Sequence, residues 1–301
     1  MSISGKTLVL VVGAPKAGTF SLYQHFANHE EVQVSRWKEP NYFVEAEFNA
    51  EGMKYIDSDR DYIRQFDVKS STRVILEASP SYLRCPKSPG KILSFAKKHR
   101  LSGIKIIISL RDPVDRAFSN WMMDVRQGHQ VKDFKSAFFE DYESHCGRDK
   151  MLIQYEYFRA GLYFEDVNNY INSFGHENVF VIGSKRLKEY PLSSLNELER
   201  FIGIRKSEYI FGAAVNDARI PRNRVINYLY YNNVLRRAQR FILNDVAKDY
   251  IRRLLFRRDK RKISSFLTTY EIDQIYSCYR NDFENLRSRF GPEVIYWGQD
   301  E

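Results

Sequence analysis

The chain has 301 residues, with 47 lysines and arginines against 38 aspartates and glutamates, and a formal net charge of +9. This length allows one large α/β domain or two small ones, and the 43% of hydrophobic residues can form a sizeable core. The positive charge favours a polyanionic partner or a highly charged nucleotide without choosing between them. No apolar run approaches the roughly 20 residues of a membrane span, which argues against a transmembrane protein.

The cysteines indicate a reducing compartment. The chain has three, Cys85, Cys146 and Cys278, and an odd number without zinc-type spacing does not suit a disulfide framework. The apolar run near the N-terminus is too short for a signal peptide and is better explained as a core strand. We therefore expect a cytoplasmic protein.

Strand-like and helix-like segments alternate through the first two thirds of the chain, and IKIIISL, residues 104–110, is the clearest buried strand. The expected strands are Thr7–Val12, Val32–Val34, Arg73–Glu77, Ile104–Leu110 and Asn178–Ile182. The expected helices are Ser21–Ala27, which could start as early as Thr19, then Tyr55–Phe66, Pro89–His99, Val114–Val125, Phe164–Phe174 and Leu195–Ile202. This alternation predicts an α/β fold with a parallel sheet flanked by helices.

The last third of the chain has a different character. Arginines are interleaved with apolar residues between Asn227 and Lys262, and a long amphipathic helix is expected at Tyr270–Phe290. Without repeats or a low-complexity linker, the sequence predicts a single domain, residues 1–301, with a helical C-terminal extension. About residues 222–265 would form a basic helical segment, a candidate lid. Because it has no nucleic-acid-binding motif, we expect no specific nucleic-acid partner.

The stretch VLVVGAPKAGTFSLYQHF, residues 9–26, has the build of a phosphate-binding loop between a strand and a helix. Gly13 and Gly18 would let the backbone approach a ligand closely, and backbone N–H groups at a helix N-terminus favour an anion. Lys16 adds a positive charge and the Thr19 hydroxyl adds a donor. The stretch predicts a phosphate or sulfate site, although such short motifs also occur in ordinary tight turns.

This loop differs from that of nucleotide kinases, in which a lysine follows the second glycine and an acidic residue helps to hold Mg²⁺. Here Thr19 follows Gly18 directly, with Phe20 and Ser21 after it, so the kinase lysine is missing. A donor with phosphates and a sulfuryl group is the other candidate. A sulfuryl group carries less charge than a phosphoryl group, so a lysine can stabilise the departing oxygen without a metal.

The stretch KIIISLRDPVDRAFSNW, residues 105–121, repeats the strand–loop–helix arrangement. Ligands of open α/β sheets bind at the carboxyl ends of the strands, so Arg111 could hold an anion there, with Ser119 as a second donor. Taken alone, the stretch favours a simpler interpretation, in which Arg111 pairs with Asp112 or Asp115 at the start of the helix.

The stretch SRWKEPNYF, residues 35–43, contains Glu39 beside a lysine and a proline. A carboxylate next to an anion-binding loop can act as a general base when its position suits the proton. A single glutamate in a charged loop is more often an ordinary surface residue.

Together and in this order, the stretches resemble the sulfotransferases that use 3′-phosphoadenosine 5′-phosphosulfate (PAPS). The similarity is greatest to the carbohydrate branch, with the heparan sulfate N- and O-sulfotransferases and their bacterial relatives. The resemblance covers about residues 7–225. The stretches that carry it are GAPKAGTFSLYQHF, KEPNYF, LEASPSYL, SLRDPVDRAFSNW and GLYFEDVNNYINSFGHENVFVI.

The resemblance implies a P-loop-like sheet and an enzyme that moves a sulfuryl group from PAPS to a hydroxyl or amine by in-line attack, leaving PAP and using no metal. The acceptor would be a carbohydrate or a small molecule. Lys16 would stabilise the bridging oxygen as the bond breaks, and Glu39 would take the proton of the acceptor. The implied donor-binding residues are Lys16, Ala17, Gly18, Thr19, Phe20 and Ser21 around the 5′-phosphosulfate, Arg111 and Ser119 at the 3′-phosphate, Tyr163 near the nucleotide and Arg219 in a basic loop over it.

The chain departs from the family pattern in LEASPSYL, where Ala78 stands at a position that is often lysine. Either a nearby cation such as Lys38 or Arg84 replaces it, or the acceptor does not need it. The vertebrate relatives carry a Golgi membrane anchor, and without one a bacterial cytosolic enzyme fits better.

Several alternatives stay open. The acceptor could be a small natural product, such as an alkaloid or antibiotic, rather than a glycan. The chain could instead be a non-catalytic protein that binds polyanions through its basic surface. His25 and His29 have a spacing that can bind zinc, but no third ligand is apparent, so we expect no metal. The oligomeric state is not indicated by the sequence.

Overall fold

The computed structural model describes residues 2–45, 55–147, 156–207, 219–221, 256–258 and 262–292. For residues 146–147, 219–221 and 256–258 the description is limited to the backbone.

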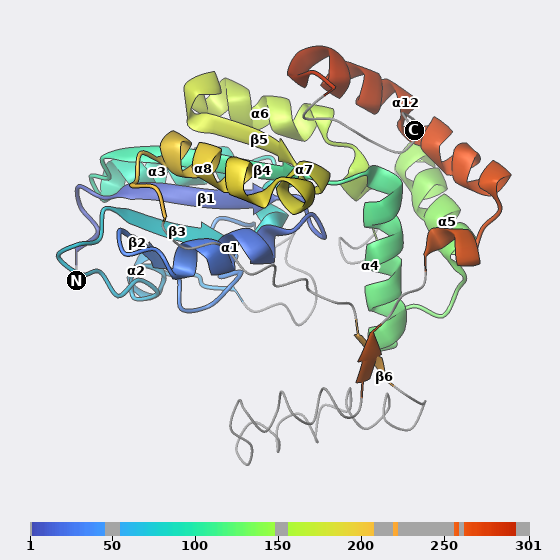
Figure 1. Cartoon of the computed structure of the whole chain (residues 1–301), viewed down its shortest axis with the longest axis horizontal. Helices are drawn as coiled ribbons and strands as arrows, with labels where there is room; N and C mark the ends of the chain where they lie inside the picture. The colour runs from blue at the N-terminus through green and yellow to red at the C-terminus, as the bar shows by residue number, and fades with distance from the viewer. Residues whose placement is uncertain are drawn as a thin grey trace.

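A five-stranded parallel sheet lies at the centre of the described structure (Figure 1). Its strands follow the order β2-β3-β1-β4-β5, and all neighbouring pairs are parallel. The strands are β1 Thr7–Gly13, β2 Val32–Val34, β3 Val74–Ala78, β4 Gly103–Leu110 and β5 Val179–Gly183. The predicted α/β fold with a parallel sheet is confirmed.

Helices cover both faces of the sheet because its central strands are apolar on both sides. In β1, Leu8 and Leu10 pack into one core with residues of α3 and α6, whereas the alternate residues Val9 and Val11 pack into another with α1 and α8. Figure 1 shows these helices packed around the strands. Their bounds are α1 Thr19–Ala27, α3 Ser88–Lys98, α6 Phe164–Phe174 and α8 Pro191–Ile202.

The order of the strands explains where a ligand should bind. From β1 the chain continues through α1 to β2 on one side of the sheet, whereas from β4 it continues to β5 on the other side. The carboxyl ends of β1 and β4 therefore flank the point at which the connections diverge, the usual ligand position in open α/β sheets. The two strands are neighbours, with Gly13 opposite Ile108.

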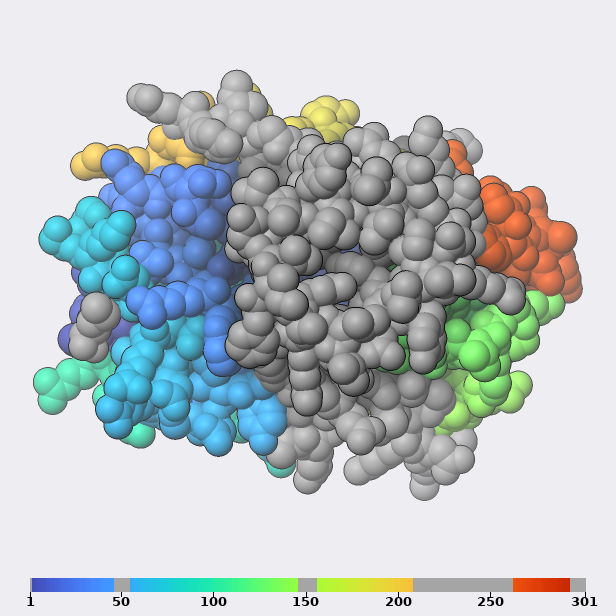
Figure 2. All heavy atoms as spheres, turned by 90° about the horizontal axis from the view of Figure 1, so that it is seen from below, coloured from blue at the N-terminus to red at the C-terminus, as the bar shows by residue number. Residues whose placement is uncertain are grey.

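Three helices beside the sheet share a further apolar core: α4 Pro113–Gln127, α5 Phe134–Gly147 and α12 Thr269–Phe290. Helix α12 begins with a capping box, in which Thr268 and Glu271 satisfy each other's backbone N–H groups. In Figure 2, α5 and α12 lie at the end of the molecule opposite the blue and cyan segments of the first hundred residues. Helix α12 confirms the predicted helical C-terminal region at residues 269–290.

The remaining described elements are short. They are the helices α2 Asp59–Ile63 and α7 Ser184–Glu189, the antiparallel pair β6 Arg219–Pro221 and β7 Phe256–Arg258, and 3-10 turns at Pro80–Tyr82, Arg159–Gly161, His176–Asn178 and Ile263–Ser265.

Several predicted helix ends differ from the structure, among them that of α8, which begins at Pro191 rather than Leu195. The first helix begins at Thr19, the earlier of the two starts considered from the sequence, because Gly18 takes a left-handed conformation (φ 87°) and lets the chain enter the helix at once. The second spans Asp59–Ile63 rather than Tyr55–Phe66, because the Ser58 hydroxyl accepts the Asp61 N–H and fixes the start. Helices α5 and α7 were not expected.

The prediction of a helical segment at residues 222–265 is wrong at Phe256–Arg258. These residues form β7, which pairs with β6 so that Arg258 lies opposite Arg219. Pairing with a distant strand outweighs a local helical pattern. Most of this segment, and with it the candidate lid, lies outside the described residues. No helix within the described ranges has the length and apolar character needed to cross a membrane.

Candidate active site

The loop between β1 and α1 is held by the backbone and side chain of Ser109, near the end of β4. The Ala14 N–H donates to the Ser109 carbonyl at 2.6 Å, and the Ser109 hydroxyl donates to the Ala17 carbonyl at 2.6 Å. A Cβ on Gly13 would come within 2.6 Å of Leu83, so only glycine fits there. Within a helix the first N–H groups have no acceptor, so those of Thr19 and Phe20 can bind an anion, favoured by the macrodipole.

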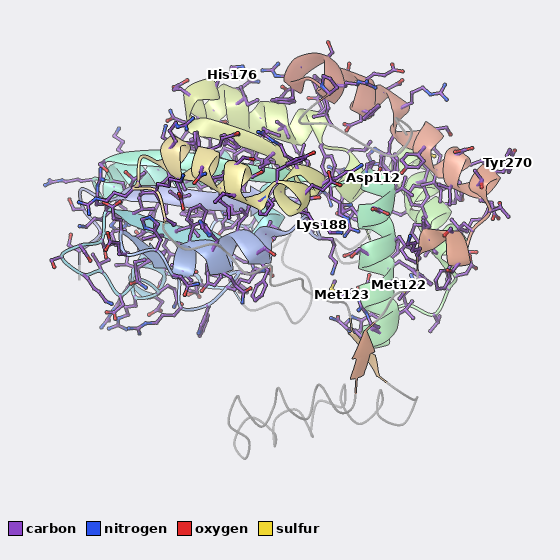
Figure 3. All side chains as sticks on the ribbon, in the orientation of Figure 1. Asp112, Met122, Met123, His176, Lys188 and Tyr270 are labelled. Atoms are coloured by element: carbon purple, nitrogen blue, oxygen red, sulfur yellow. The ribbon has the colours of Figure 1, made fainter. Side chains whose placement is uncertain are left out.

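Lys16 lies inside this loop with its backbone in the left-handed region, at φ 68°. Its ammonium group is 3.5 Å from the sulfur of Met123 on α4. Figure 3 labels Met123 on the side of α4 that is nearer the sheet. Burial, then the guanidinium groups of Arg126 and Arg111, lower the pKa of Lys16 to about 8, against an opposing effect of Asp124. An anion at this position would relieve the repulsion among these cations.

Arg111 lies directly beside the loop. Its Nη1 donates to the Lys16 carbonyl at 3.2 Å, and its Nη2 is 3.6 Å from the Asp115 carboxylate. The Tyr163 hydroxyl donates to the Arg111 carbonyl at 3.0 Å. The structure thus brings Lys16 and Arg111 together. It also contains the pairing of Arg111 with Asp115 that the sequence suggested as a simpler role for this arginine.

The other expected donor residues lie around the same two strand ends. Ser21 is in the first turn of α1, where its N–H donates to the Gly18 carbonyl at 3.0 Å. Ser119 is half-buried on α4, and its hydroxyl makes no hydrogen bond within the described part of the chain. Tyr163 is buried at the start of α6. The backbone of Arg219 belongs to β6 near the lower end of α4 in Figure 1. Its side chain lies outside the description, so its role stays a prediction.

Glu39 lies in the loop after β2 and is bound to its neighbour Lys38 in an ion pair. The Glu39 side chain is 43% exposed, and its backbone has a φ of 63°. The Lys38 ammonium group also lies 5.7 Å from the centre of the Phe20 ring, in the first turn of α1. Through Lys38, the candidate base is therefore connected to the candidate donor loop.

The stretch after β3 holds this loop in place. The Asn41 N–H donates to the Ser79 hydroxyl oxygen at 3.1 Å, and the Asn41 side chain donates to the Glu39 carbonyl at 3.0 Å. The Ser81 hydroxyl donates to Asn41 Oδ1 at 2.6 Å. Asn41, with φ 51°, thus joins the backbone of Glu39 to the end of β3.

The two cations suggested as replacements for a lysine at Ala78 have different surroundings. Arg84 is buried in an ion pair with Glu156, which occupies its guanidinium group. Lys38 pairs instead with Glu39. Of these two, only Lys38 contacts an expected catalytic residue.

Glu77, on β3, was missed as a candidate residue. Its carboxylate is fully buried and accepts a hydrogen bond from the Ser79 hydroxyl at 2.8 Å. Burial raises the pKa of Glu77 to about 7, although hydrogen bonds from Tyr82, Ser79 and Tyr62 oppose the shift. A charged residue inside the apolar run VILEA was the signal that could have identified it.

The two histidines with zinc-type spacing have separate partners. His25 lies 3.0 Å from Glu199, and His29 lies 2.9 Å from the Arg205 carbonyl. Among the described residues, no group of three or more His, Cys, Asp or Glu side chains is placed to hold a metal ion.

The comparisons with curated proteins give partial matches. The chain is 25% identical over 199 residues to bifunctional heparan sulfate N-deacetylase/N-sulfotransferase 4 of Mus musculus, a match to 65% of this chain and 22% of that protein. It is 24% identical over 202 residues to heparan sulfate glucosamine 3-O-sulfotransferase 5 of the same species, a match to 66% of this chain and 55% of that protein. The chain thus aligns with between a fifth and about half of the length of these relatives.

Two solved structures share the fold. A sulfotransferase from Alicyclobacillus acidocaldarius superposes with a TM-score of 0.66 at 22% identity, covering 93% of this chain and 94% of that one. A mouse sulfotransferase complexed with PAP gives a TM-score of 0.50 at 14% identity, covering 98% and 88%. At such identities these likenesses establish the fold alone. The family model described as "Sulfotransferase domain" matches residues 6–263, most of the chain. The chain therefore belongs to the sulfotransferase family.

Proposed function

We propose that this protein is a sulfotransferase that moves a sulfuryl group from PAPS to a hydroxyl or amine of a carbohydrate or small-molecule acceptor. The observation that carries the proposal is the contact between the two strand-end loops, in which Arg111 Nη1 donates to the Lys16 carbonyl at 3.2 Å. It places two cationic side chains at the ends of adjacent strands. A single nucleotide with phosphates at both its 3′ and 5′ positions can span such a pair of sites.

The groups of this chain fit such a nucleotide. The N–H groups at the start of α1, together with Lys16, suit the 5′-phosphosulfate. Arg111 suits the 3′-phosphate, because its guanidinium group can bind two oxygens at once and its side chain is 32% exposed. When bound, the nucleotide supplies the sulfuryl group and a phosphate as leaving group. The half-buried Ser119 hydroxyl is a further donor on the Arg111 side.

Lys16 and Glu39 would do the chemical work. The Lys16 ammonium group would turn from Met123 to the bridging oxygen and stabilise the charge that develops there. The Glu39 carboxylate would accept the proton of the acceptor hydroxyl or amine. Lys38, between Glu39 and the Phe20 ring, would keep the base beside the donor loop.

For the acceptor we propose a carbohydrate first and a small natural product second. The curated relatives named above act, by their names, on heparan sulfate, and the net charge of +9 suits an acidic glycan. We also propose a single domain working without a metal in the cytoplasm of a bacterium.

A thermal-shift comparison of PAP and AMP tests the donor assignment. PAP should raise the melting temperature and AMP should do so far less, because AMP lacks the 3′-phosphate and a ligand of the folded state stabilises it. Equal shifts would remove the role given to Arg111. Salt-dependent binding of polyanions without any PAP binding would favour the non-catalytic alternative.

A transfer screen with PAPS tests the reaction. Candidate acceptors are glycans and small metabolites with hydroxyl or amine groups. With an accepted substrate, Glu39→Gln should lose most of the rate and still bind PAP. Full activity of Glu39→Gln would mean that another group takes the proton.

A further inference from the structure

Helix α12 contacts the residues around Arg111 at the end of β4. This helix lies beyond residue 263, where the match to the family model ends. We propose that α12 completes the donor site, with Tyr276 and Asp282 as positioning residues that hold Arg111 for the 3′-phosphate. This inference rests on the proposed function, because it assigns α12 to the nucleotide site of that same reaction.

The first contact runs through the residue next to Arg111. The Tyr276 hydroxyl donates to Asp112 Oδ2 at 2.8 Å, and Asp112 Oδ1 accepts the Asp115 N–H at 2.9 Å. Both carboxylate oxygens of Asp112 are therefore fixed, one by α12 and one by the first turn of α4. Since Asp112 follows Arg111 directly, α12 sets the direction in which the chain leaves Arg111. Figure 3 labels Asp112 at the upper end of α4.

The second contact reaches the carbonyl of Arg111 through Tyr163. Asp282 accepts the N–H groups of Tyr163 and Phe164, each at 2.9 Å, and so caps the N-terminus of α6 from another helix. The Tyr163 hydroxyl then donates to the Arg111 carbonyl at 3.0 Å. Helix α12 thus braces the backbone after Arg111 along two routes, once through Asp112 and once through Tyr163.

A third contact fixes α12 itself. The Tyr279 hydroxyl is 3.1 Å from the Tyr157 carbonyl and 3.0 Å from the Phe158 carbonyl. A Cβ on Gly161 would come within 2.8 Å of the Tyr279 ring, so a glycine allows this close approach. Because Tyr279 lies one helical turn from both Tyr276 and Asp282, the three side chains project from one face of α12.

This arrangement links α12 to the selectivity of the nucleotide site. A helix that merely stabilised the fold would affect all nucleotides alike. A helix that positions Arg111 affects the nucleotide with a 3′-phosphate and leaves one without it unchanged. The ratio of PAP to AMP affinity therefore separates the two roles.

The experiment measures PAP and AMP dissociation constants by calorimetry on the full chain and on Tyr276→Phe and Asp282→Asn. Each variant should weaken PAP binding about fivefold or more, the effect of one lost hydrogen bond, and change AMP binding less than about twofold. The control is Tyr270→Phe on the same helix, because Tyr270 is 71% exposed and lies at the outer end of α12 in Figure 3. It should behave as the wild type.

A double-mutant cycle gives the sharper test. In an Arg111→Ala background, Tyr276→Phe should have no further effect on PAP binding, because the residue it positions is gone. Unchanged PAP affinity in Tyr276→Phe, or equal losses for PAP and AMP, would overturn the role of α12. If Asp282→Asn does not fold, Tyr276→Phe decides alone, since it removes one hydroxyl and no charge. Failure of the wild type to bind PAP would instead contradict the proposed function.

Discussion

The candidate site has two parts, which are built in different ways: the β1 corner, with Lys16 after the end of β1, and the β4 corner, with Arg111 after the end of β4. The β1 corner consists of backbone groups and one lysine, whose ammonium group has only the Met123 sulfur at 3.5 Å as its hydrogen-bond partner among the described residues. The β4 corner is held by side chains from distant segments, with Tyr163 on the Arg111 carbonyl and Tyr276 on Asp112. The positive charge of Lys16 is therefore poorly neutralised, whereas the backbone around Arg111 is firmly positioned.

This difference suits the two ends of the proposed nucleotide. Binding of the 3′-phosphate needs a guanidinium group that is fixed before the ligand arrives, because preorganised donors lose little freedom on binding. The reacting end needs a cation whose interaction strengthens as charge develops on the leaving oxygen. A half-buried lysine among guanidinium groups meets that need, since every added negative charge stabilises it further.

The largest expected effect is at the β1 corner. Lys16→Ala should reduce the rate of sulfuryl transfer from PAPS about 100-fold or more, the usual cost of removing a group that stabilises transition-state charge. PAP affinity should fall much less. Steady-state kinetics with an acceptor from the transfer screen measures the loss. The control is Lys97→Ala, at an exposed lysine near the C-terminal end of α3 and away from the carboxyl ends of the strands, which should keep its activity.

The next effect is at the β4 corner. Arg111→Ala should weaken PAP binding about tenfold or more, because charge-assisted hydrogen bonds to a phosphate are lost. AMP affinity should change little. Calorimetric titration with both nucleotides measures the two constants. An equal loss for PAP and AMP would mean that Arg111 does not distinguish the 3′-phosphate.

The pH dependence of PAP binding should distinguish the contribution of Lys16 from that of Arg111. With a pKa of about 8, Lys16 loses its proton above that pH in the free protein and must regain it to bind an anion as a cation. PAP affinity should therefore fall as the pH rises from about 7.5 to 9, by up to tenfold per pH unit above 8. Lys16→Arg should bind PAP with a flatter profile, because arginine stays charged. A wild-type profile as flat as that of Lys16→Arg would contradict this assignment.

The smallest effect concerns the neighbouring strand β3. Burial raises the pKa of Glu77 to about 7, so the folded chain keeps a proton that the unfolded chain loses near its ordinary value. This group makes folding less favourable as the pH rises from about 4.5 to 7. Glu77→Gln removes the ionisation and should raise the melting temperature more at pH 7.5 than at pH 5. The exposed control Glu284→Gln should show no such difference in calorimetry.

The sequence was informative where the physical cause is local. Gly13, Lys16 and Gly18 lie within one loop, and their spacing after an apolar strand was enough to predict an anion site there. Parallel strands were equally visible, because each is an uninterrupted apolar run. The left-handed conformation of Gly18 decides between the two possible starts of α1 in favour of Thr19.

Long-range contacts were not predictable from one sequence. The Tyr276–Asp112 bond joins residues 164 positions apart, and nothing in either segment indicates the other. Helix α5 was missed although its aromatic residues recur at helical spacing, because the polar residues among them in FKSAFFEDYESHCG leave only a weak amphipathic pattern. The strand at Phe256–Arg258 was expected to be helical, since its partner β6 lies far away in the sequence.

The central claim is that one doubly phosphorylated adenosine joins the two corners, and a crystal structure with PAP tests it most directly. The account expects the 5′-phosphate at the N-terminus of α1 beside Lys16 and the 3′-phosphate on the Arg111 guanidinium group. A PAP molecule bound away from these strand ends, or with its 3′-phosphate out of reach of Arg111, would contradict it.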